Sequence, residues 1–274
     1  MGIRINTNIA ALNTRRHITN TTNQFNKSME KLSSGLRINR AADDAAGLAI
    51  SEGLKSDIRA LEQASRNASD GISLVQTAEG ALDEVSNILL RMKELAEQSL
   101  NGTLSDTERG YLDAEYTALT EEIDRIAAST EFNGIELLSG GGGSIAIQVG
   151  IGTAATDSIA VDLSNNRDSS TLTLAAGIGN ATDAATAMGQ VDAAIQTVSG
   201  ARADFGAIQN RLESSIRNIN NTAENLSAAN SRIRDVDMAM ETSRMTSYQI
   251  LQQAGVSVLA QANLTSGLAL SLLS

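Results

Sequence analysis

Apolar residues recur every seven positions along much of this chain. One series lies in the C-terminal half, at Val191, Val198, Phe205, Leu212, Ile219, Leu226, Ile233 and Met240. A second series lies upstream, at Leu61, Ala68, Val75, Leu82, Leu89 and Ala96. A period of seven is typical of a long helix that packs lengthwise on another helix. We predict two such helices that share an intrachain seam, formed by the members of the two series up to Leu89 and Leu226.

Two shorter series extend the pattern. The first begins near the N-terminus, at Ile18, Phe25 and Leu32, with Met29 and Leu36 interleaved. The other consists of Leu112, Tyr116, Leu119, Ile123 and Ile126. The chain is therefore expected to be mainly α.

Turn residues set the predicted boundaries of these helices. The expected helices cover about residues 8–36, 56–99, 105–129 and 184–274, the last with a break near 235–237 and flexibility at Gly255 and Gly267. Ser105 and Glu108 have the spacing of a capping box, and Asn133-Gly134 is expected to end the third helix. Two runs of alternating apolar residues predict a β-hairpin at about 144–163. The segment 164–184, rich in Ser, Thr, Asn and Gly, is expected to be an exposed, variable insert.

The composition favours rods over a globular enzyme core. Only 2% of the residues are aromatic, and tryptophan, proline and cysteine are all absent. Proline costs about 3 kcal/mol inside a helix, so its absence suits long uninterrupted helices. The absence of cysteine excludes disulfides, thiol catalysis and cysteine-ligated zinc.

The charge is unevenly distributed. The net charge is −11, and residues 79–136 contain fourteen acidic side chains against four basic ones. This acidic surface makes nucleic acid an unsuitable partner. In contrast, residues 248–274 carry no charge but contain four glutamines and an asparagine, whose amides would be unpaired in lipid, so we predict no membrane partner. We expect this uncharged tail to be buried against protein, mostly from other molecules.

No catalytic, cofactor or metal site is predicted. His17 is the only histidine and has no evident convergent partners. Asp43 and Asp44 are adjacent, so they would point apart on a helix, and we expect them to pair with Arg37 or Arg40. Residues 140–143 are all glycine but are not followed by the Lys-Ser/Thr of a phosphate loop.

Four stretches of the sequence resemble signatures of the bacterial flagellins. They are MGIRINTN at 1–8, LSSGLRIN with AADDAAGLAI over 32–50, QASRNASDG at 63–71 and LQQAGVSVLAQAN at 251–263. The resemblance covers roughly residues 1–163 and 185–274. It implies an inner terminal coiled-coil domain, formed by residues 1–44 with 235–274, and an outer helical-bundle domain over 45–234 that carries the β-hairpin. The chain is expected to be a minimal form without the large outer domains of other members.

The resemblance also implies a function. Flagellins are structural subunits that polymerise into the flagellar filament, the helical propeller of swimming bacteria. Localisation outside the cell, type III export without a cleaved signal peptide, and contacts with an export chaperone, the filament cap and the hook-junction proteins are implied as well. We expect the terminal helices to be disordered in the free subunit and to order on assembly, since an isolated helix nucleates poorly. The residues expected to mediate self-assembly are Ile18, Phe25, Leu32, Leu36, Leu251, Ala254, Val258, Leu259 and Ala262.

Two further sets of residues are implied by the resemblance. Arg91, Leu95 and Glu115 match residues through which flagellins contact the host flagellin-sensing Toll-like receptor. Ser169, Ser170 and Thr171 are the expected acceptors if this chain is O-glycosylated, as flagellins often are.

Three alternatives remain at this point. A hook–filament junction protein has similar ends, and its copy number in purified filaments would distinguish it. A signalling coiled coil of the chemoreceptor type would need a transmembrane segment, which the sequence lacks. An enzyme would need a nucleophile–base pair or a metal constellation, which we cannot assemble from these residues.

Overall fold

The computed structural model describes residues 7–165, 167–174 and 177–271. The described residues form five α-helices, a short 3-10 helix and two small antiparallel sheets, which confirms the predicted mainly α fold class. The chain divides into two compact units, Asp57–Glu224 and the combination of Met1–Ser56 with Asn225–Ser274. We call the second of these the terminal unit and the first the central unit.

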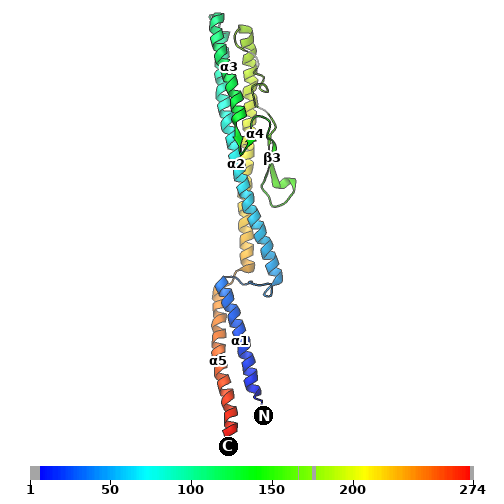
Figure 1. Ribbon diagram of the computed structural model, residues 1–274, viewed down its shortest axis with the longest axis vertical. Coiled ribbons are helices and arrows are strands. Elements are labelled where there is room, and N and C mark those ends of the chain that lie inside the picture. The colour runs from blue at the N-terminus through cyan, green and yellow to red at the C-terminus, as the bar shows by residue number, and fades with distance from the viewer. Residues whose placement is uncertain (1–6, 166, 175–176, 272–274) are drawn as a thin grey trace. The chain divides into compact units, whose positions relative to one another are not determined.

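The terminal unit is built on an antiparallel pair of helices, α1 (Ile9–Ser34) and α5 (Met238–Ser271), which lie side by side (Figure 1). Helix α1 begins after Asn8, whose side chain accepts a hydrogen bond from the Ala11 amide, and ends at Gly35 in a left-handed conformation with φ 73°. Helix α5 continues through Gly255 without a break.

Two short backbone crossings connect the terminal helices to the rest of this unit. The Arg37 amide donates to the Arg234 carbonyl at 2.6 Å, and the Val236 amide donates to the Gly35 carbonyl at 3.0 Å. The Arg37 guanidinium also donates to the Ile233 carbonyl. Because these bonds tie the two crossings together, residues 235–237 form the predicted helix break and are held in place.

The central unit contains most of α2 (Ala45–Leu100) and α4 (Ala181–Arg234), together with α3 (Asp106–Ser129). Lys93 pairs with Asp192 at 2.6 Å and Asp83 pairs with Arg202 at 2.9 Å, which fixes α2 and α4 in antiparallel register. The predicted seam residues of this unit are all at least 93% buried: Leu61, Ala68, Val75, Leu82, Leu89, Val191, Val198, Phe205, Leu212 and Ile219. The last predicted member, Leu226, lies in the terminal unit and is only half-buried.

The predicted β-hairpin is present as β3 (Gly143–Gln148) paired with β4 (Ser158–Leu163). The turn between the strands contains a 3-10 helix, Ala155–Asp157, whose last carbonyl accepts the amides of Val149 and Gly150. A second, smaller hairpin pairs β1 (Glu131–Phe132) with β2 (Ile135–Glu136). Asn133 and Gly134 at its turn both have positive φ, 51° and 76°, as a tight hairpin turn requires.

Some boundaries differ from the predictions. The capping box at Ser105 and Glu108 is confirmed, but α2 begins eleven residues earlier than predicted, because the Asp44 carboxylate accepts the Gly47 amide at 2.8 Å and begins a helix there. Asn133-Gly134 forms a hairpin turn instead of ending α3, which stops at Ser129.

The insert is less exposed than expected. Leu172, Leu174 and Ile178 are all at least 95% buried. The Ile178 amide donates to Asp113 on α3, and the Ile178 carbonyl accepts the Ser99 hydroxyl of α2. These bonds attach the segment to α3 and to the C-terminal end of α2, so part of it belongs to the core.

The candidate assembly interface

The least exposed positions of α1 and α5 follow an alternating spacing of three and four residues. On α1 this row consists of Ala11, Thr14, Ile18, Thr21, Phe25, Ser28 and Leu32. On α5 it consists of Glu241, Met245, Tyr248, Gln252, Gly255, Leu259 and Ala262. This is the spacing of a coiled-coil seam. We refer to these two rows as the terminal seam.

Contacts across the terminal seam confirm its register. The Asn8 amide group donates to the Ala262 carbonyl at 2.8 Å, and Gln252 donates to the Thr22 hydroxyl at 3.2 Å. Between these two bonds, Gly255 lies directly against Ile18. The helix pair is therefore held partly by polar contacts and by one close approach at a glycine.

No apolar side chain of the terminal seam is completely buried. Among the α1 and α5 side chains that the structure describes, only Ser28 and Glu241 are more than 90% buried, and both are polar. The Glu241 carboxylate has Arg244 as its partner at 3.5 Å. Since apolar burial is the main favourable term in helix packing, the pair lacks the core that the central unit has.

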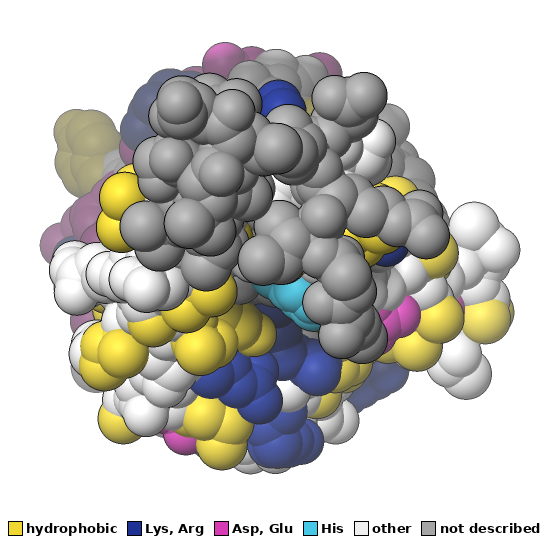
Figure 2. All heavy atoms as spheres, turned by 90° about the horizontal axis from the view of Figure 1, so that it is seen from below, with side chains coloured by type: hydrophobic (Ala, Val, Ile, Leu, Met, Phe, Trp, Pro, Cys, Tyr) yellow, Lys and Arg dark blue, Asp and Glu magenta, His cyan; other side chains and the backbone are white. Residues whose placement is uncertain are grey.

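Large apolar side chains instead point outward from both helices. They are between 50% and 61% exposed: Ile9, Leu12 and Met29 on α1, and Met238, Met240, Ile250, Leu251, Val256, Val258 and Leu264 on α5. In Figure 2, seen from below, the hydrophobic side chains form several separate groups, and Lys and Arg side chains lie next to the single histidine, His17. Exposed apolar surface on this scale is typical of a surface that binds another protein.

The predicted self-assembly residues fall into two groups. Ile18, Phe25, Leu32, Leu259 and Ala262 lie half-buried in the terminal seam, and Leu36 is half-buried in the crossing that follows α1. Leu251, Ala254 and Val258 are exposed on α5. Sequence reasoning missed the exposed Ile250, Val256 and Leu264, although their location in the uncharged tail was a usable signal.

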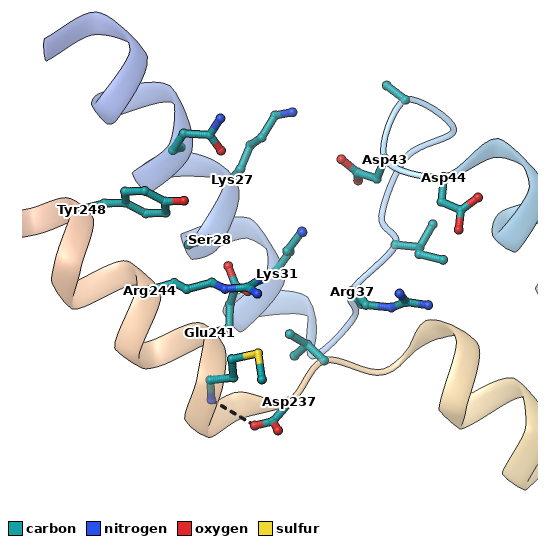
Figure 3. Close-up of a pocket in the computed structure, with 15 residues that line it drawn as sticks. Lys27, Ser28, Lys31, Arg37, Asp43, Asp44, Asp237, Glu241, Arg244 and Tyr248 are labelled. Carbon is teal, nitrogen blue, oxygen red and sulfur yellow. Dashed lines mark hydrogen bonds and ion pairs between the residues drawn. The ribbon is translucent and has the colours of Figure 1, made fainter. Parts of the chain in front are cut away.

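A polar cavity of about 650 Å³ lies where α1, α5 and the crossings meet (Figure 3). Lys27 and Lys31 of α1 lie on one side, and Asp43 and Asp44 lie on the other. Both of these aspartates are committed to backbone amides: Asp43 accepts the amides of Asn39 and Arg40, and Asp44 accepts that of Gly47.

These bonds replace the expected ion pairs. Arg37 binds a carbonyl, and Arg40 pairs with Glu30 at 2.8 Å instead of with Asp43 or Asp44. A carboxylate next to backbone amides in a turn accepts their hydrogen bonds, which leaves the arginines to find other partners. The cavity lining is therefore a structural junction.

Within residues 7–165, 167–174 and 177–271, no three His, Cys, Asp or Glu side chains are grouped so that they could hold a metal ion. Over the same residues, no helix combines the length and apolarity needed to cross a lipid bilayer.

The residues implied by resemblance lie in the central unit. Arg91 pairs with Glu115 at 2.9 Å and with Glu94 at 3.0 Å, and hydrogen bonding to Glu115 is the main reason that the pKa of Arg91 is raised. Leu95 is completely buried. The structure thus brings Arg91 and Glu115 together at the surface but places Leu95 in the core.

The three hydroxyl residues of the insert also differ. Ser169 is half-buried, and both its amide and its hydroxyl donate to Asp124, at 2.7 and 2.9 Å. Ser170 and Thr171 are exposed. The side chains of the latter two are therefore more accessible than that of Ser169.

Comparison with known proteins agrees with this architecture. Residues 5–142 match the family described as the bacterial flagellin N-terminal helical region, and residues 188–273 match the bacterial flagellin C-terminal helical region. The chain is 50% identical over 262 residues to a flagellin of Halalkalibacterium halodurans, covering 94% of this chain and 95% of that one. It is 46% identical over 295 residues to a flagellin of Bacillus subtilis, covering 95% and 96%. The crystal structure of Bacillus cereus flagellin matches with a TM-score of 0.52 and 36% identity, over 60% of this chain and 94% of that one.

Proposed function

Because the chain belongs to the bacterial flagellin family, we propose that its helices α1 and α5 are the surfaces through which copies polymerise, and that they become ordered only on assembly. Flagellins are structural proteins that form the filament of the flagellum, an extracellular appendage for motility. This chain is accordingly a filament subunit, of a short form that fits its 274 residues.

One observation carries the proposal about the terminal helices. The described parts of α1 and α5 contribute no apolar side chain to the buried core, whereas α2 and α4 supply an almost continuous one. Ordering a residue costs roughly 1–2 kcal/mol of backbone entropy. The apolar side chains of the terminal seam are only half-buried and offset part of that cost, so the remaining stabilisation must come from other molecules.

Neighbouring copies can supply the missing burial. Burying a large aliphatic side chain contributes about 1.5–3 kcal/mol, and α5 alone holds seven large apolar side chains that are more than half exposed. Covering them in a polymer would offset the ordering cost. Folding of the terminal helices is thereby coupled to assembly.

The test is truncation of the tail. Deletion of residues 251–274 should abolish filament formation, judged by electron microscopy, while the helical circular dichroism of the central unit remains. In the full-length chain, backbone amides of α1 and α5 should exchange rapidly with solvent in the free subunit and slowly in the filament. A truncated chain that still forms filaments, or terminal amides already protected in the free subunit, contradicts the proposal.

The same proposal extends to location and partners. Residues 1–44 with 235–274 form the inner layer of the filament, and residues 45–234 form the outer layer. The subunit leaves the cell through the flagellar type III channel without a cleaved signal peptide. An export chaperone covers the apolar surface of α5 before assembly, and the filament cap and hook-junction proteins contact the same terminal unit.

Two sites on the central unit complete the proposal. Arg91 and Glu115 contact the host flagellin-sensing Toll-like receptor directly, supported by their exposure of nearly one half. Leu95 acts from the core by positioning α2. If the chain is O-glycosylated, Ser170 and Thr171 are the acceptors, since Ser169 is bonded to Asp124. Mass spectrometry of the intact subunit and its peptides tests this last point.

A further inference from the structure

We infer that the terminal unit carries two different surfaces that fit one another, and that a stripe on α5 of one copy enters a groove beside α5 of the next copy. The inference rests on the proposed function, because it assumes that the terminal helices form the contacts between subunits. It adds which faces meet and why the contact continues from copy to copy.

The groove lies between α1 and α5. It has a volume of about 460 Å³ and is lined by Phe25, Gln249, Gln252, Gln253 and Val256. The Phe25 ring is half-buried, and Val256 is 55% exposed. The groove therefore offers an apolar floor with amide groups around it and no charged side chain.

The stripe lies on another face of the same helix. Ile250, Leu251, Ala254 and Val258 are all exposed, and the three larger side chains are 55–60% exposed. Residues three, four and seven apart on a helix share a face, so these four side chains form one continuous apolar surface. We call it the α5 stripe.

Helix geometry separates the two surfaces. With about 100° per residue, the α5 residues of the groove centre roughly 170° around the helix from the α5 stripe. The terminal seam lies between them on one side. The groove and the stripe thus face away from each other, and a single copy can use both at once with two different neighbours.

A contact between unlike surfaces has a defined consequence. Two copies that join stripe to groove leave one free stripe and one free groove, so a third copy can add in the same way. Unless the rotation closes a ring, the product is an open helical array. A contact between like surfaces would instead stop at a dimer.

The second copy is the occupant that the chemistry favours. Residues 248–274 contain no charged side chain, so neither surface can offer an ion pair to a charged partner. Such a partner would lose hydration without compensation. The α5 stripe is uncharged and apolar, and it is presented by every copy in a protein whose relatives form filaments.

Cross-linking tests this arrangement, because the chain contains no cysteine. We would make Gln253→Cys in the groove, Val258→Cys in the stripe, and the double variant, then polymerise each and treat the filaments with a short bis-maleimide. The double variant should give a ladder of covalent multimers on a denaturing gel. Each single variant should stay monomeric. A control pairing Gln253→Cys with Tyr111→Cys, the latter 73% exposed in the central unit, should give no ladder.

The outcomes separate this inference from the proposed function. Filaments of the double variant that yield no ladder, or single variants that yield dimers, overturn the groove-and-stripe contact and leave the filament role intact. If the terminal helices are not the assembly surface, truncation of residues 251–274 leaves polymerisation unchanged.

A second set of variants covers the case in which the double variant does not polymerise. Val258→Asp, which keeps its groove, should stop growth of wild-type filament seeds at one end, and Val256→Asp, which keeps its stripe, should stop growth at the other end. A variant that stops both ends, or neither, overturns the inference.

Discussion

Gly255 of α5 lies so close to Ile18 of α1 that a Cβ atom added to the glycine would fall 2.8 Å from the Ile18 Cγ1. Isoleucine in a helix strongly prefers one χ1 rotamer, so Cγ1 of Ile18 cannot move aside at low cost. The absence of a side chain at position 255 is therefore what allows the two terminal helices to approach at this point. This glycine acts by packing and not by flexibility, because α5 continues through it.

Replacement of Gly255 by Ala should weaken assembly. Overpacking of a tight contact typically costs about 1–3 kcal/mol, which corresponds to roughly a five- to hundredfold higher subunit concentration for polymerisation. Sedimentation of filaments over a concentration series measures the change. The matched control is Gly200→Ala in α4, where an added Cβ meets nothing within 4 Å. That variant should polymerise normally and melt at a slightly higher temperature, since Ala favours the helix.

A similar close approach occurs in the central unit. A Cβ on Gly71 of α2 would overlap the Ile147 side chain of β3. We expect Gly71→Ala to displace the β3–β4 hairpin and to destabilise the unit by about 1–3 kcal/mol, measured by denaturant unfolding. Gly80→Ala on the same helix has open space around it and serves as the control. Equal stability of the two variants would show that the hairpin yields without cost.

The two units differ in how well the sequence predicts them. In the central unit, residues such as Leu82 and Leu212 are buried within the chain itself, so heptad periodicity identifies them correctly. In the terminal unit, the seam contains Thr14, Ser28 and Gln252, which give no hydrophobic signal, while apolar residues such as Leu251 point outward. Periodicity identifies the apolar face of a helix that will be buried. It cannot tell whether the residues that bury this face belong to the same chain or to another copy.

Local chemistry also explains the boundaries that were wrong. The start of α2 depends on a hydrogen bond from the Gly47 amide to the Asp44 carboxylate, which the seven-residue spacing of apolar side chains does not reveal. The Asn133-Gly134 pair ends a helix or turns a hairpin equally well, and the choice is made by strands of only two residues on each side. Such choices depend on contacts that are not visible in a single sequence.

The capping box of α3 should make stability depend on pH. The amide and hydroxyl of Ser105 both donate to the Glu108 carboxylate, at 2.8 and 2.9 Å, and these bonds hold the pKa of Glu108 below its usual range. A carboxylate with a lowered folded-state pKa stabilises the fold above its unfolded pKa of about 4.3. That contribution is lost as the pH falls through the lowered value.

Glu108→Ala should therefore lower the melting temperature at neutral pH. At acidic pH the melting temperatures of the variant and of the unsubstituted chain should become equal. Glu108→Gln keeps the hydrogen-bond acceptor without the charge and is the control. A difference between the Ala variant and the parent that persists unchanged at low pH would assign the effect to helix propensity alone.

Burial of Tyr116 should make the folding stability fall at alkaline pH. Its side chain is almost completely buried, its hydroxyl has no hydrogen-bond partner among the described residues, and burial, with a further contribution from Asp113, raises the pKa of Tyr116 to about 12. Since an unfolded tyrosine ionises near pH 10, stability should be lost as the pH rises from about 10 to 12. Tyr116→Phe should remove this loss and should be neutral or stabilising by up to about 1 kcal/mol at pH 7. Tyr111→Phe, at an exposed site, should leave the alkaline limb unchanged.

Substitutions at Arg91 and at Leu95 should affect receptor activation in different ways. Arg91 lies at the surface and Leu95 is fully buried, so truncating Arg91 removes a surface group and truncating Leu95 removes core packing. Arg91→Ala should reduce the response of cells that express the flagellin-sensing Toll-like receptor while the melting temperature changes little. Leu95→Ala should cost about 2–5 kcal/mol of stability, and its response should fall only as far as the central unit unfolds. Leu95→Met, which nearly conserves volume, should restore both the stability and the receptor response. A Leu95→Met variant that is stable yet inactive would instead mean that the receptor contacts the leucine side chain itself. Such a contact would require this part of α2 to open on binding.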